Sequence, residues 1–96
     1  MFPGLTTKLS EETLASADAI SPKSDLVRIT GSTAINIINP AFGGGFSGTL
    51  ILVPVDGAVV LGTSGNILVG ITMAVNRAVQ LFWSKSAAKW YIDNGV

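Results

Sequence analysis

The glycine-rich run at residues 43–48 is the part of the sequence that comes closest to a cofactor-binding motif. Its letters, GGGFSG, fit the G-x-G-x-x-G spacing of loops whose backbone N–H groups surround a pyrophosphate. That chemistry requires a helix directly after the loop. Residues 49–53 instead form an apolar, strand-like run, and no Gly-Lys-Ser/Thr sequence occurs in the chain. The run therefore predicts a bent loop between strands and no bound cofactor.

The carboxylates are the second set of side chains that could carry chemistry. General acid–base catalysis needs two acids that converge across a cleft, but Glu11 and Glu12 are neighbours and the four aspartates are scattered along the chain. Asp25 and Asp56 would have to meet in space, and no loop has the alternating oxygen ligands that bind Ca²⁺. With no His and no Cys, the chain also lacks imidazole and thiolate groups. We predict no catalytic residue, no metal site and no enzymatic activity.

The third candidate is a carboxyl-terminal cluster of cations and aromatic rings, which would suit a platform for stacked nucleotide bases. It comprises Arg77, Phe82, Trp83, Lys85, Lys89, Trp90 and Tyr91. The whole chain, however, has six basic and six acidic side chains and no net charge. Because phosphate contacts dominate affinity for nucleic acids, so few cations predict no nucleic-acid partner. The cluster favours a closing β-hairpin with its cations at the solvent edge.

The composition bounds the architecture that must position these side chains. The 96 residues allow one domain with one modest core, and only 12% of them are charged. A surface with so few charges and no net charge repels other copies weakly, so we expect part of the exterior to be covered in an oligomer or a larger assembly. Asn39, Pro40 and several glycines interrupt the uncharged stretches 29–55 and 57–76, so no membrane span is predicted.

A change in composition divides the chain into an arm, residues 1–24, and a β-rich body, residues 25–96. Ser10, followed by two glutamates, could cap a short helix that runs to Ala17. The hydroxyl residues and the proline that follow favour an extended arm, and both alternatives stay open. The predicted contacts of the arm with a partner surface are its apolar residues Phe2, Pro3, Leu5, Leu9 and Leu14.

The body shows short runs of alternating apolar and polar residues with turn residues between them, which is typical of antiparallel β structure. The predicted strands are 26–30, 34–38, 49–53, 58–61, 67–75 with a break at Gly70, 78–84 and 88–92. Asp56 and Gly57 predict a tight hairpin turn. The fold class is therefore all-β, a small antiparallel β-barrel or sandwich of six or seven strands with an extended amino-terminal arm. Glycines recur every 17 residues at Gly31, Gly48 and Gly65, but the turns between them do not align, so a solenoid is the less favoured alternative.

Near the carboxyl terminus the alternation assigns residues to faces. Val79, Leu81 and Trp83 share one side of a strand, and if they fill the interior, Phe82 and Tyr91 point outward. Exposed aromatic rings suit a contact between subunits, whereas the alternative is a ring partly covered by neighbouring loops. The predicted subunit contacts are Phe82, Trp90 and Tyr91. The predicted exposed loop residues are Gly43, Gly44, Gly45, Ser64 and Asn66.

Several runs together resemble a short β domain of tailed-bacteriophage virion proteins. They are an Ile-x-Pro start at residues 20–22, V-x-I-T-G at 27–31, G-F-x-G-x-L at 45–50, G-N-I at 65–67 and W-Y at 90–91. The resemblance extends from residue 13 to residue 92. Related domains occur as small head-decoration proteins and as terminal domains of tail fibres and spikes, commonly as trimers.

The resemblance implies a structural virion protein that performs no reaction. The expected function is capsid decoration: a cement protein that binds the outer surface of a phage head and stabilises contacts between capsid subunits. Its expected partners are further copies of itself, in a homotrimer, and the major capsid protein, with the arm reaching onto the shell. A Met1 of its own favours such an accessory subunit. The alternative is a terminal or collar domain of a tail fibre or spike, whose exposed loops contact a host receptor.

Overall fold

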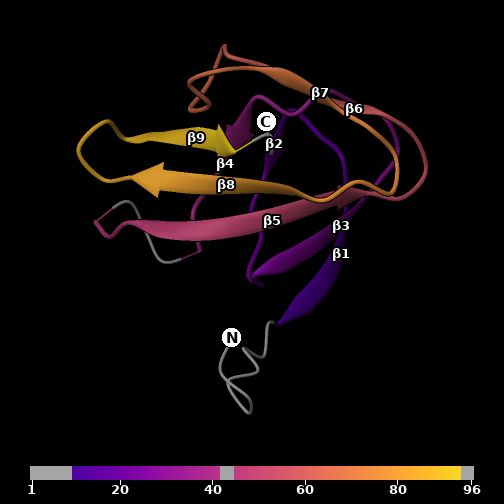
Figure 1. Cartoon of the computed structure of the whole chain (residues 1–96), viewed down its shortest axis with the longest axis horizontal. Coiled ribbons are helices and arrows are strands. Elements are labelled where there is room, and N and C mark those ends of the chain that lie inside the picture. The colour runs from indigo at the N-terminus through magenta and orange to yellow at the C-terminus, as the bar shows by residue number, and fades with distance from the viewer. Residues whose placement is uncertain (1–9, 42–44, 94–96) are drawn as a thin grey trace.

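The computed structural model describes residues 10–41 and 45–93, which form only strands, turns and connecting segments (Figure 1). The nine strands in these ranges are β1 (Glu11–Ala15), β2 (Ala19–Ile20), β3 (Leu26–Thr30), β4 (Ile37–Ile38), β5 (Gly48–Pro54), β6 (Val59–Leu61), β7 (Ile71–Met73), β8 (Val79–Ser84) and β9 (Lys89–Asp93). The prediction of an all-β fold is confirmed. The predicted strands of the body correspond to β3 to β9.

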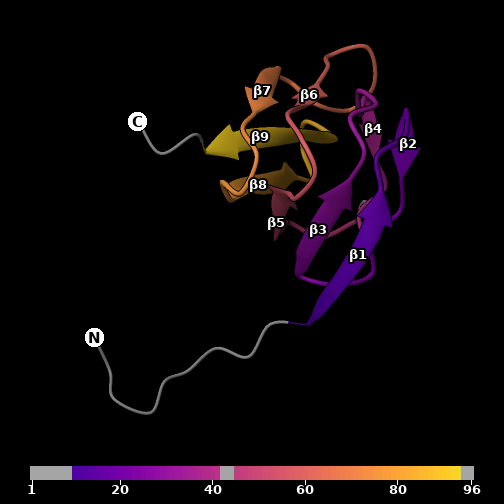
Figure 2. The same ribbon diagram turned by 90° about the vertical axis from the view of Figure 1, so that its right-hand side faces the viewer.

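A five-stranded sheet in the order β1-β3-β5-β8-β9 forms the larger layer (Figure 1). β1, β3 and β5 run parallel to one another, whereas β5 with β8 and β8 with β9 are antiparallel pairs. The prediction of purely antiparallel structure is therefore wrong for the first half of the chain. After β1, and again after β3, the chain crosses to a second layer and returns to the large sheet in the same direction (Figure 2).

The second layer consists of two small sheets, the parallel pair β2–β4 and the antiparallel pair β6–β7. An isolated parallel bridge joins Ile35, just before β4, to Leu61 of β6, and a second joins Ile67 to Trp90 of β9 in the large sheet. The sheets described here do not close into a barrel, so that part of the prediction is wrong.

The tight hairpin predicted at Asp56 and Gly57 is also wrong. β5 pairs with β3 and β8, while β6 pairs with β7, so these two residues connect two different sheets. The Asp56 carboxylate instead accepts a hydrogen bond from the backbone N–H of Gly31, with an N···O distance of 3.1 Å. The chain does bend at these two residues, but the strand that follows, β6, belongs to another layer.

The core lies between the two layers and is built from side chains that alternate along the strands. β8 shows the pattern most clearly, since Val79, Leu81 and Trp83 are buried, as predicted. The second layer contributes residues such as Ile38 and Ile67, of which Ile38 is completely buried. Each of these side chains stabilises the fold by about 1.5–3 kcal/mol relative to full exposure. Among the described residues no polar or charged side chain is buried, so this interior offers no site for proton transfer.

The predicted division at residue 24 does not separate an arm from a body within the described residues. Residues 11–15 form β1, not a helix, and pair with β3 along the strand, while Ile20 is part of the core. Leu14 is half-buried against the same core, and its role as a contact with a partner surface stays a prediction. The other predicted contacts of the arm, Phe2, Pro3, Leu5 and Leu9, lie outside the described residues.

Candidate functional site

The outward-facing side of the five-stranded sheet, which we call the outer sheet face, carries the residues that alternate with the core. One row across all five strands contains Glu11, Leu26, Ile51, Gln80 and Asp93. A second row contains Thr49, Phe82 and Tyr91. The middle strands present apolar residues, such as Ile51 and Phe82, beside polar ones, such as Gln80 and Thr49, whereas the edge strands β1 and β9 carry acids. Interfaces between proteins combine apolar and polar surface in this way.

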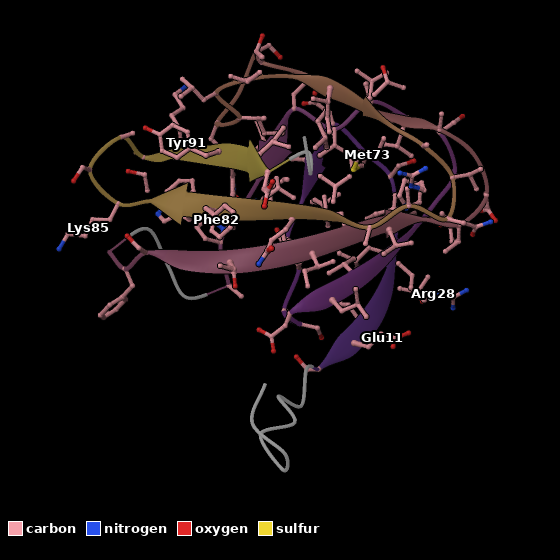
Figure 3. All side chains as sticks on the ribbon, viewed as in Figure 1. Glu11, Arg28, Met73, Phe82, Lys85 and Tyr91 are labelled. Atoms are coloured by element: carbon pink, nitrogen blue, oxygen red, sulfur yellow. The ribbon has the colours of Figure 1, made fainter. Side chains whose placement is uncertain are left out.

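Phe82 and Tyr91 are the exposed aromatic pair of this face. They lie directly opposite each other on β8 and β9, and 39% and 44% of their surfaces are exposed (Figure 3). Their outward direction is as predicted from the alternation of β8. Their role as a contact between subunits stays a prediction.

Trp90, the third predicted subunit contact, is wrong because only 1% of its surface is exposed. It lies opposite Trp83 on the inner side of the hairpin, and the two rings meet edge to face with centroids 5.3 Å apart. The indole Nε1–H donates a hydrogen bond to the carbonyl of Ile38, at 2.9 Å. A ring that is buried and hydrogen-bonded in this way stabilises the fold and is not available to a partner.

The charges of the outer sheet face are few and balanced. Glu11 and Asp93 are offset by Arg28 and Lys89, whose positions in the register place them on the same side of the sheet. Arg28 and Glu11 project from neighbouring strands in Figure 3. The charged residues of this face therefore leave no excess of either sign.

Three connections meet at the end of the molecule where β8 turns into β9, and we call this the loop end (Figure 1). Gly48 lies opposite Trp83, which places residues 45–47 beside this turn. Lys89 Nζ donates a hydrogen bond to the carbonyl of Gly65, at 2.9 Å, which brings residues 64–65 to the same end. Phe46 is 69% exposed there.

The predicted exposed loop residues therefore have different outcomes. Gly45 and Ser64 are exposed, as predicted, and Gly43 and Gly44 lie outside the described residues. Asn66 is wrong as an exposed residue, because it is half-buried and its side-chain amide bonds to the backbone of Ile38. The sequence signal that was missed is its position directly before the apolar Ile67, where a short polar side chain can bond to a neighbouring backbone.

The carboxylates do not assemble into a catalytic or metal site in the described residues. Asp25 accepts a hydrogen bond from the Ser10 hydroxyl, at 3.3 Å, just before β3, whereas Asp56 bonds to Gly31 just after β3. The two acids are thus separated by the length of a five-residue strand, about 16 Å. No group of three or more acidic, histidine or cysteine side chains within residues 10–41 and 45–93 could hold a metal ion.

Comparison of the chain with protein-family models, with curated proteins and with solved structures finds no match in any of the three. In the part of the chain that the structure describes, no helix has the length and apolar character needed to cross a membrane.

Proposed function

We propose that the protein is a structural virion subunit, a cement protein that decorates the outer surface of a phage head and stabilises the contacts between capsid subunits, as a homotrimer. The observation that carries this proposal is the outer sheet face. It presents the exposed pair Phe82 and Tyr91, with Ile51 beside them, in a chain of which only 12% of the residues are charged. Covering such a face removes apolar surface from water, and that is the term that drives most protein association.

The free edge of β1 adds a second reason to expect a partner. β1 is an outermost strand of the five-stranded sheet. The parallel register places the backbone groups of Ser10, Glu12, Leu14 and Ser16 toward β3. The backbone groups of Glu11, Thr13 and Ala15 therefore face away from the sheet. Glu11 and Glu12 place charge on this short strand, and within residues 10–41 and 45–93 no further strand covers its outer edge.

In the proposed assembly the outer sheet face packs between copies, and the apolar residues Phe2, Pro3, Leu5 and Leu9 contact the major capsid protein. Bound subunits stabilise the shell by mass action, since they bind the assembled form and not its separated parts. No reaction is assigned to the protein, because Asp25 and Asp56 lie at opposite ends of β3 and form no pair.

The copy number per particle tests this function directly. Quantitative mass spectrometry of purified virions should find the protein in hundreds of copies, on the scale of the major capsid protein. Deletion of residues 1–9 should abolish binding to heads that lack the protein, while far-ultraviolet circular dichroism shows an unchanged fold. Absence from the virion, or full binding by the shortened chain, would contradict the proposal or its anchor.

The loop end supports a second candidate, a terminal or collar domain of a tail fibre or spike. Phe46 is the most exposed of the large apolar side chains described, and it lies with Ser64 and Gly65 at one end of the molecule. Loops gathered on a rigid sheet are a common place for receptor contacts. A count of only a few copies per virion, together with loss of host attachment after Phe46→Ser, would favour this candidate over capsid decoration.

A further inference from the structure

A groove beside β7, at the end of the molecule opposite the loop end, has the composition of a small-ligand site. Its volume is about 390 Å³, and it is lined by residues 71–74 and 77–79, which belong to β7, the following turn and the start of β8. Sites for small molecules in proteins have volumes of about 300–1,000 Å³ and are mainly apolar with a few polar groups. The groove has a volume in this range, its surface is about half polar, and it takes no part in the proposed function.

The floor of the groove is apolar and firmly packed. Met73 is 1% exposed and Val79 is 8% exposed, so both belong to the core and present only an edge to the groove. The unbranched thioether of methionine adapts to apolar groups of different shape. Ala74 and Ala78 at the rim are exposed and small, which leaves room for an incoming group.

Among the described residues that line this groove, Arg77 is the one with a charge. Its backbone N–H bonds to the carbonyl of Ala74, at 3.2 Å, but within residues 10–41 and 45–93 its guanidinium has neither an acid nor another acceptor as partner. The planar fork of a guanidinium matches the two oxygens of a carboxylate. Because no second cation lines the groove, a ligand with one negative charge fits better than a phosphate dianion.

The turn that carries Arg77 is fixed before any ligand arrives. Asn76 adopts a left-handed backbone conformation, with φ of 62°, and its N–H donates to the carbonyl of Pro54 at 2.7 Å. Met73 is held by its pairing with Val59 in the β6–β7 sheet. Preorganised walls of this kind lower the entropy cost of binding.

We propose that this groove binds a carboxylate joined to a short apolar group. Arg77 holds the carboxylate, and Ile71, Ala74 and Ala78 contact the apolar part above the buried Met73 and Val79. The carboxyl-terminal residue of a peptide and a short-chain fatty acid share this chemistry. Binding is reversible and involves no covalent step.

Titration of the ¹⁵N-labelled full-length chain with small probes tests the proposal and separates the two sources. N-acetyl-leucine represents a peptide terminus, hexanoate represents a fatty acid, and N-acetyl-leucinamide is the neutral match. At least one of the two carboxylates should shift the amide signals of residues 71–79, and the tighter of them identifies the source. The amide should bind about tenfold more weakly than N-acetyl-leucine, since it lacks the charge-assisted bond. Equal affinity of the acid and the amide, or no shift in residues 71–79, would overturn the proposal.

Variants locate the site. Arg77→Gln should weaken binding about tenfold, whereas Arg28→Gln, which removes an exposed arginine from the outer sheet face, should leave it unchanged. Ala78→Leu should fill the groove and abolish binding, while Ala87→Leu in the β8–β9 turn should not. If Ala78→Leu does not fold, Arg77→Gln decides alone, because an exposed arginine is not needed for the core. Unchanged binding by Arg77→Gln would refute the site.

Discussion

The side-chain amide of Asn66 pairs with both backbone groups of Ile38. Its Nδ2 donates to the Ile38 carbonyl at 2.8 Å, and its Oδ1 accepts from the Ile38 N–H at 2.9 Å. A neighbouring strand would make the same two bonds. Because Ile38 is completely buried in β4, its backbone groups need such partners. The side chain of Asn66 thus takes the place of a further strand beside β4.

Replacement of Asn66 by alanine should be among the most destabilising polar substitutions in the chain. It removes two hydrogen bonds and leaves the buried N–H of Ile38 without an acceptor, which costs about 2–3 kcal/mol of the free energy of unfolding. The matched control is Asn39→Ala, because Asn39 is exposed and bonds to the Ser21 hydroxyl at 3.0 Å, and we expect a loss of about 0.5 kcal/mol. Urea unfolding measures both. Equal losses of stability in the two variants would show that the Asn66 hydrogen bonds contribute no more than the exposed bond of Asn39.

The Ile38 carbonyl also accepts the bond from Trp90 Nε1, so the two donors should be coupled. Trp90→Phe should cost about 1–3 kcal/mol. In either single variant one donor remains at the carbonyl, whereas the double variant leaves it with none. The double variant should therefore lose more than the sum of the single losses, by about 0.5–3 kcal/mol. A double-mutant cycle that closes additively would contradict this view of the shared acceptor.

Gly31→Ala should destabilise the protein through its backbone conformation. Gly31 has φ of 76°, and an added Cβ would lie 2.9 Å from the Ser16 hydroxyl, which already accepts a bond from Thr33 N–H. The expected cost is about 1–2 kcal/mol. Gly57→Ala is the control, since its Cβ would point into open space. Thermal unfolding should show a lowered midpoint for the first variant and no decrease for the second.

Loss of the exposed aromatic pair should weaken self-association without unfolding the chain. Phe82→Ser combined with Tyr91→Ser removes two rings that contribute little to the core, and the dissociation constant of the oligomer should rise at least about tenfold. Val60→Ser on β6, where the side chain is 45% exposed, changes another surface and should have no effect. Sedimentation velocity at several concentrations measures the change. An equally weakened assembly after Val60→Ser would argue against the outer sheet face as the contact.

Local patterns in the sequence predicted the positions of β3 to β9, but they missed β1 and β2 and did not predict the parallel pairing. The strand at 26–30 was located correctly because its alternation and the following Gly31 are local signals. Asp56 and Gly57 likewise marked a true change of direction. The layer that the chain enters after that turn is decided by which apolar faces pack together, and no window of a few residues contains that information.

The same limit applies to the prediction of surface residues. The outward direction of Phe82 and Tyr91 follows from a period of two along each strand. Trp90 was grouped with them as an aromatic residue, although its position alternates with Tyr91 and places it inside. The groove at Arg77 could not be predicted, because it depends on β7 and β8 belonging to different sheets.

The shared carbonyl of Ile38 also has a consequence for synthesis on the ribosome. Its two side-chain donors belong to residues 66 and 90. β5, the central strand of the large sheet, also needs β8 as its antiparallel partner. A nascent chain that has not yet emerged through residue 90 can complete neither layer, so its apolar strands remain open to chaperones until that residue has left the ribosome. Folding of the two layers is therefore expected in a single step, after residue 90 has emerged.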